Sequence, residues 1–103
     1  MHIAVTKVKL KPGTAADCAR LFEETNPALV RDQPDWLGAQ MAFDAETNTV
    51  TVIAQWKDIE SYQRLSGSST FQQAMGKFAA FFAGPPEITS MEVLVDMKPE
   101  DLV

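Results

Sequence analysis

Hydrophobic side chains at every second position predict four strands in this chain. Residues 3–10, 36–44, 50–56 and 88–95 each have this period and are bounded by turn-forming residues. The third segment, VTVIAQW, is the most informative, because it has little polar surface on either face. A strand of this kind has to be covered on both sides. The chain's own helices can cover one side, and a second copy of the protein can cover the other.

The first helical pattern follows a Pro-Gly turn. Thr14 is predicted to cap this helix, with Asp17 three residues later as a capping-box partner. Pro27 interrupts the pattern, because proline removes one helical hydrogen bond and crowds the preceding turn; a kink near Asn26 is therefore expected. The apolar stripe of the helix is Cys18, Leu21, Phe22, Thr25 and Leu29.

The second helical region falls into two pieces. Asp58 is predicted to cap a short helix that ends at Leu65, and residues 66–68, Ser-Gly-Ser, break it. Ser69 then caps a second piece, with Gln72 at the capping-box spacing. A Gly-Pro-Pro sequence ends this piece. Its apolar stripe is Phe71, Met75, Phe78 and Phe82.

The resulting order β-α-β-β-α-β predicts an α+β protein of ferredoxin-like fold, with one domain over residues 1–103. This fold is a four-stranded antiparallel sheet with both helices on one face. The other sheet face stays open, and an apolar patch of that size on a small domain indicates an interface. A homodimer through the open sheet face is therefore expected. Depending on register, that face carries Ile3, Val5, Leu37, Met41 and Phe43, or their alternates.

Composition and charge exclude several classes of partner. Of the 103 residues, 46% are hydrophobic and 22% are charged, which is typical of a globular protein. The net charge of −5 argues against nucleic-acid binding and against docking on an anionic membrane. The sequence has no run long enough for a transmembrane helix, and its first residues lack signal-peptide architecture. A cytoplasmic protein is predicted.

Motifs for cofactor or metal chemistry are missing from the sequence. It contains no glycine-rich phosphate loop, no CxxC, no HExxH and no GxSxG. Cys18 is interpreted as a small buried hydrophobe. The single histidine, His2, is a possible general base, but its place at the chain start favours surface exposure. An enzyme built on this chain would therefore have no metal and no cofactor.

The segment 50–82 resembles the antibiotic biosynthesis monooxygenase-like family of the dimeric α+β barrel superfamily. The shared pattern is a strand ending in Trp56, an acidic-capped helix carrying Tyr62, and a Phe-rich helix. The resemblance extends over nearly all of the chain. It implies a monooxygenase that oxidises a polycyclic aromatic or quinol-type substrate with molecular oxygen, without metal, haem or flavin. Such a protein binds a flat aromatic, stabilises its anion and excludes water.

The same resemblance implies the site residues. Trp56 and Tyr62, six positions apart (62 − 56), are similar to a tryptophan and a tyrosine that donate hydrogen bonds to the substrate in this family. Val52 and Gly76 stand where well-studied members carry asparagine and arginine. The substrate-binding candidates are Asn26, Phe22, Phe71, Met75 and Phe78.

Each candidate also has a structural interpretation. Trp56 and Tyr62 can serve as core anchors, and Asn26 can satisfy the helical hydrogen bonds that Pro27 breaks. A haem-degrading branch of the superfamily is disfavoured, because Met75 and Leu65 stand where a ligand histidine and a tryptophan are expected.

The alternative function is a non-catalytic dimeric barrel that binds a small apolar ligand or acts as a stress or regulatory module. A pocket between sheet and helices, with Trp56 and Tyr62 pointing in, favours an enzyme. The same space filled by Phe22, Phe71 and Phe78 favours a structural protein.

Overall fold

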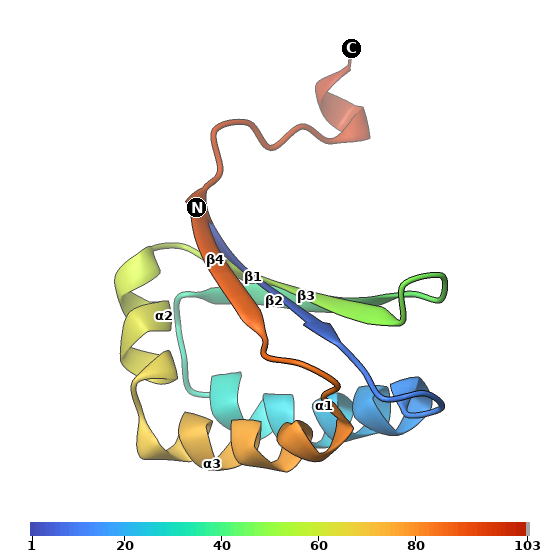
Figure 1. The fold of residues 1–103 in the computed structure, drawn as a ribbon. Helices are drawn as coiled ribbons and strands as arrows, with labels where there is room; N and C mark the ends of the chain where they lie inside the picture. Colours follow the sequence, from blue (N-terminus) through green and yellow to red (C-terminus); the bar gives the residue numbers. More distant parts are fainter. Residues whose placement is uncertain (103) are drawn as a thin grey trace.

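A four-stranded antiparallel sheet packs against a layer of helices (Figure 1). The computed structural model describes residues 1–102. Within that range the sheet order is β2-β3-β1-β4 and all three pairings are antiparallel, so the predicted ferredoxin-like α+β fold is confirmed. The strands are β1 His2–Lys9, β2 Trp36–Asp44, β3 Thr49–Trp56 and β4 Glu87–Glu92. The helices are α1 Ala15–Val30, α2 Ile59–Ser66 and α3 Ser69–Phe78, with short 3₁₀ turns η1 Ala79–Phe81 and η2 Pro99–Asp101.

Strand register determines which side chains face the helices. Residues directly opposite each other in an antiparallel sheet point to the same side. Ala54 pairs with Ala4 on β1 and Ala39 on β2, and Val50 likewise pairs with Val8 and Phe43. The helix-facing residues therefore include His2, Ala4, Thr6, Val8, Trp36, Ala39, Met41, Phe43, Val50, Val52, Ala54, Trp56, Ile88, Ser90 and Glu92.

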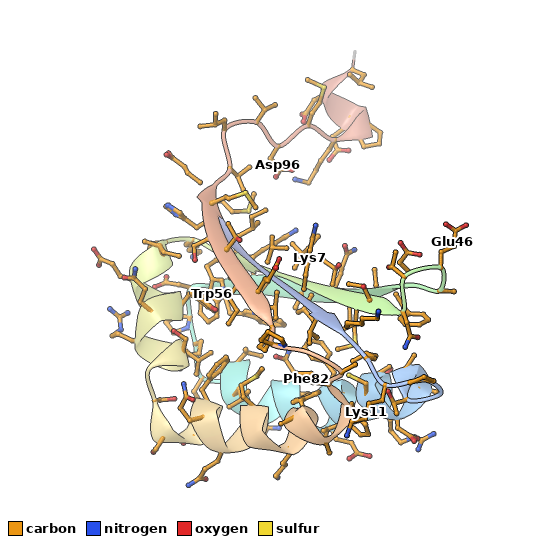
Figure 2. All side chains as sticks on the ribbon, viewed as in Figure 1. Lys7, Lys11, Glu46, Trp56, Phe82 and Asp96 are labelled. Atoms are coloured by element: carbon orange, nitrogen blue, oxygen red, sulfur yellow. The ribbon has the colours of Figure 1, made fainter. Side chains whose placement is uncertain are left out.

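The uncovered sheet face differs from one of the two predicted sets. Ile3 and Val5 lie on it, but the register places Met41 and Phe43 on the helix side. The register of β2 against β3 shifts between Trp36 and Gly38, which indicates a bulge at Leu37. Because of this extra residue, Met41 and Phe43 point to the same side of the sheet as Trp36. The uncovered face also carries Ile53 and Met91, together with Lys7, Gln40, Thr51, Gln55 and Thr89. Figure 2 shows Lys7 on the side of the sheet away from the helices.

Of two predicted cap residues, one is correctly placed and the other is off by one residue. Thr14 is the N-cap residue of α1 as predicted, although its hydroxyl donates to the Lys11 carbonyl at 2.8 Å and makes no side-chain cap. Ser68, and not Ser69, caps α3, since its hydroxyl accepts a hydrogen bond from the Phe71 amide at 3.2 Å. Pro27 lies inside α1, which continues past the expected stripe residue Leu29 to Val30; the kink near Asn26 stays a prediction.

The fourth strand is shorter than the alternation predicts. It ends at Glu92 rather than at residue 95. The reason is its partner: His2 pairs with Glu92, and the Val93 amide donates to the Met1 carbonyl at 2.9 Å. The paired part of β4 therefore ends opposite the start of β1. Residues 93–102 run away from the sheet (Figure 1).

The main core lies between the central strands and helices α1 and α3. Its buried members are Val8, Leu10, Cys18, Val50 and Phe78. Burial raises the pKa of the Cys18 thiol, which therefore stays protonated and packs as a small apolar group. No helix within residues 1–102 is both long enough and apolar enough to cross a membrane.

Replacing Ser68 with alanine is expected to lower the free energy of unfolding by about 1 kcal/mol, because the Phe71 amide loses its capping acceptor. Ser69→Ala, one residue later, is the matched control and should change it by less than about 0.5 kcal/mol. Chemical denaturation of both variants measures the difference. Equal losses in the two variants would contradict the assignment of Ser68 as the cap.

Candidate functional site

A cavity of about 110 Å³ lies between the sheet and the helices. Helix-facing residues of β1, β2 and β3 form one wall, and α1, α2 and α3 form the other. Every predicted site residue is part of its lining: Phe22, Asn26, Trp56, Tyr62, Phe71, Met75 and Phe78. The space is therefore open rather than filled by the phenylalanines.

Trp56 ends β3 and forms one wall of this cavity. Its side chain is only 1% exposed, yet its indole nitrogen Nε1 has no hydrogen-bond partner among residues 1–102. Most buried polar groups in folded proteins are hydrogen-bonded, so an unpaired N–H here is unusual. Figure 2 shows Trp56 on the helix side of the sheet, close to α2.

Tyr62 reaches the same cavity from α2. Its ring lies 6.0 Å from the Trp56 ring between centroids, with an interplanar angle of 58°. Burial raises the pKa of the Tyr62 phenol, because the charged form loses its hydration. The hydroxyl therefore stays protonated at neutral pH and can donate a hydrogen bond. The aromatic pair thus carries an N–H and an O–H donor beside apolar walls.

A buried serine fixes α2, and with it Tyr62, relative to β2. Ser61 is 2% exposed, and its hydroxyl donates to an Asp35 carboxylate oxygen at 2.7 Å. The same hydroxyl accepts a hydrogen bond from Arg64 at 3.1 Å. The Asp58 carboxylate accepts from the Ser61 amide at 2.9 Å, and this bond lowers the pKa of Asp58. Of these contacts, only the Asp58 cap was predicted from the sequence. Ser61 and Asp35 are 26 positions apart, and no local sequence pattern indicates that they pair.

The polar residue at the proline in α1 also lines the cavity. Asn26 and its neighbour Thr25 are both part of the cavity lining. The Thr25 hydroxyl donates to the Leu21 carbonyl at 2.8 Å. Val52 lines the cavity as well. Gly76 is not part of the lining, and a side chain there would meet open space.

The prediction that His2 is frayed and exposed is wrong. His2 begins β1, pairs with Trp56 on one side and with Glu92 on the other, and is half-buried. Its ring nitrogen Nδ1 is buried without a hydrogen-bond partner among residues 1–102. The cause is the β4 ladder, which reaches the first residue of the chain and holds this strand end in place.

A second, more polar recess adjoins the cavity. Its volume is about 350 Å³, and it shares Leu29 and Leu65 with the cavity lining. Its polar members are Asp32, Gln33, Arg64, Ser68 and Thr70. Neither this recess nor Trp36, which pairs with Trp56 and lines the cavity, was predicted as part of the site. In residues 1–102, no three His, Cys, Asp or Glu side chains gather closely enough to hold a metal ion.

Solved structures share this fold. A candidate antibiotic biosynthesis monooxygenase from Bordetella bronchiseptica is 18% identical, with a TM-score of 0.79 over 91% of this chain and 97% of that one. Another from Caulobacter crescentus is 19% identical, with a TM-score of 0.78 over 91% and 90% of the two chains. A variant of SnoaB, a cofactor-independent oxygenase from Streptomyces nogalater, is 16% identical, with a TM-score of 0.77 over 93% and 95%. These likenesses establish a common fold.

The family comparison is the more specific one. Curated protein sequences gave no match. The family model described as antibiotic biosynthesis monooxygenase matches residues 1–77, a stretch that contains β1 to β3, Trp56, Tyr62 and most of α3. The chain therefore belongs to the antibiotic biosynthesis monooxygenase family.

Proposed function

We propose that this protein is a cofactor-independent monooxygenase that oxidises a polycyclic aromatic or quinol-type substrate with molecular oxygen. The observation that carries the proposal is the Trp56 indole nitrogen, which is buried and unpartnered in the wall of an apolar cavity beside Tyr62. A small rotation of the indole would turn this N–H toward a substrate oxygen. Donors held in a dry site stabilise the anion formed when the substrate loses a proton, and an electron-rich anion can reduce oxygen.

The two adjoining spaces favour a substrate with one ring inside and a larger part outside. A cavity of about 150 Å³ binds one benzene ring, so the inner cavity of about 110 Å³ takes no more than a single ring. The rest of a larger aromatic would extend past Leu29 and Leu65 into the outer recess. Arg64 and Gln33 there supply hydrogen-bond donors for its oxygen substituents.

Oxygen uptake by the purified protein tests the proposal. With a panel of hydroxynaphthoquinols and anthrones, we expect uptake above the rate without protein, unchanged by a metal chelator. Tyr62→Phe should lower the rate about tenfold or more, because one substrate donor is lost. Gln63→Asn, an exposed change on the same helix, should leave the rate unchanged. An uptake rate equal to that without protein across the panel would count against oxygenase activity.

A second function, ligand binding without chemistry, is favoured by one observation. Val52 lines the cavity and can neither donate nor accept a hydrogen bond, so at this position the β3 wall offers an anion no stabilisation beyond that of Trp56. Under this alternative the aromatic panel binds, quenching tryptophan fluorescence, but consumes no oxygen. Binding and oxygen uptake measured on the same samples therefore separate the two functions.

We further propose that two copies associate through the uncovered sheet face. Ile3, Val5 and Ile53 lie on that face with Met91 at its edge strand. The segment after β4 carries exposed apolar side chains, including Leu94 at 85% exposure, and runs away from the domain (Figure 1). Exposed apolar surface of this kind marks association sites, and a second copy supplies the same surface in return.

Light scattering coupled to size exclusion tests this association. The wild-type chain should elute as a dimer, and Ile53→Lys should weaken the dimer at least tenfold, because a charge on this face loses its hydration. Gln63→Lys on the helix side introduces the same side chain away from the interface and should remain dimeric. A dimeric Ile53→Lys variant would place the interface elsewhere.

A further inference from the structure

Two buried ring nitrogens without partners occur on directly opposed residues. They are Nδ1 of His2 and Nε1 of Trp56, the unpartnered buried side-chain nitrogens and oxygens found in residues 1–102. The two residues pair across β1 and β3, so their side chains leave the sheet on the same side, with Cβ atoms about 5 Å apart. A buried polar group without a hydrogen-bond partner destabilises the folded state. Two such groups side by side indicate a place built for a polar atom.

His2 continues the row of cavity-facing residues on β1. Ala4, Thr6 and Val8 line the cavity, and His2 precedes them at the same spacing of two. The histidine therefore stands at the end of the cavity where Trp56 and Tyr62 also lie. Pairing on both sides, with Trp56 and Glu92, fixes its backbone there.

The cavity itself lacks a proton acceptor. Its lining contains no aspartate, glutamate, lysine or histidine. The lining residues that can ionise are Tyr62 and Cys18, and burial raises the pKa of both, so both stay protonated. A reaction that begins by deprotonating a hydroxyl on the substrate therefore needs a base at the edge of this lining, and imidazole is the side chain that exchanges protons near neutral pH.

We infer that His2 is the proton acceptor for the substrate hydroxyl whose oxygen Trp56 binds; this inference rests on the proposed function. The substrate O–H bond breaks, its proton moves to His2 Nδ1, and the electron pair stays on the substrate oxygen. His2 Nδ1, which has no hydrogen-bond partner within residues 1–102, takes up this proton, and the imidazole becomes an imidazolium. The new oxyanion accepts the Trp56 N–H, so that both buried nitrogens gain a partner in one step.

Other charged or titratable groups lie on the elements packed against this end of β1. Glu92 on β4 is the direct neighbour of His2 on the same sheet side. The remaining groups are the Met1 amino group, Lys57 after β3, and Asp58, Glu60 and Tyr62 at α2. Because these groups also affect the ionisation of a bound ligand, the role of His2 is measured as the difference between the wild-type chain and its variants.

The test uses 4-nitrophenol, a single-ring probe whose absorption distinguishes the phenol from the phenolate. The protein is purified without an N-terminal tag, because His2 is the second residue. Bound to the wild-type chain, the probe should ionise at a lower pH than it does free in water. In His2→Gln the ionisation midpoint of the bound probe should rise by about one pH unit, a tenfold change in the equilibrium. His2→Phe, which keeps a ring of similar size, should show the same rise.

Two controls separate this effect from a change of structure. Nitrobenzene, which has no hydroxyl, should bind the wild-type chain and both His2 variants alike. Glu92→Gln should shift the midpoint by less than half as much as His2→Gln. An unchanged midpoint in both His2 variants would overturn the assignment while leaving the proposed function standing. A wild-type chain that binds neither probe would overturn the cavity as a substrate site, and the role of His2 with it.

Discussion

Trp56→Phe is expected to lower oxygenase turnover at saturating substrate about a hundredfold. Phenylalanine keeps most of the apolar contact in the cavity wall but removes the unpartnered N–H at Nε1. Loss of one preorganised donor to a developing oxyanion costs about a hundredfold to a thousandfold in turnover. The smaller ring should also lower the free energy of unfolding by about 1 to 2 kcal/mol, because Trp56 is fully buried.

Trp36→Phe provides the matched control for this prediction. Trp36 pairs with Trp56, lines the same cavity and undergoes the same chemical change, but its indole nitrogen is not a buried group without a partner. Oxygen uptake under saturating substrate, with denaturation curves for both variants, measures the effect. Equal turnover losses in the two variants would show that ring size, and not the Trp56 N–H, governs the reaction.

Leu10→Ala is expected to have the largest effect on stability. Leu10 follows β1, is 1% exposed and belongs to the core cluster with Val8, Cys18 and Phe78. Truncating a buried leucine removes apolar contacts and leaves a cavity, which costs about 2 to 5 kcal/mol. The backbone at Leu10 also joins three segments, because it pairs with Phe82 and bonds to Asn48. The surroundings therefore have little freedom to collapse into the space.

Leu94→Ala is the control for that loss. The change is the same, but Leu94 is 85% exposed, so the free energy of unfolding should change by less than about 0.5 kcal/mol. Urea denaturation, at a protein concentration at which light scattering finds single copies, gives both values. If Leu94→Ala destabilised the single chain as much as Leu10→Ala, Leu94 would have to be packed within its own chain, contrary to its exposure.

The strand and helix types followed from local patterns. Residues 36–44 are predicted as a strand and form β2 with the same bounds, and Asp58 caps α2 as expected. These features depend on side-chain alternation and on a hydrogen bond three residues away, so neighbouring residues contain the needed information. The choice between Ser68 and Ser69 as the α3 cap depended on backbone geometry, which two adjacent serines cannot distinguish.

The candidate site was predicted only in part. The cavity lining contains Trp56, Tyr62 and the other candidates, which the family resemblance and the helical stripes had indicated. The anchoring bond from Ser61 to Asp35 and the position of His2 opposite Trp56 were not predicted. Both contacts join residues that are far apart in the chain, and no spacing in the sequence shows that Ser61 pairs with Asp35 or that His2 lies opposite Trp56.

The sequence by itself determined the order of the elements, the antiparallel sheet and the family, because periodicity and capping are local and the Trp56–Tyr62 pattern lies within one segment. Tertiary structure decided the strand register. The bulge at Leu37 turned Met41 and Phe43 toward the helices, and the β4 ladder held His2 beside Trp56. Register is a choice among pairings of similar local energy, so it is settled only when the whole sheet packs against its helices.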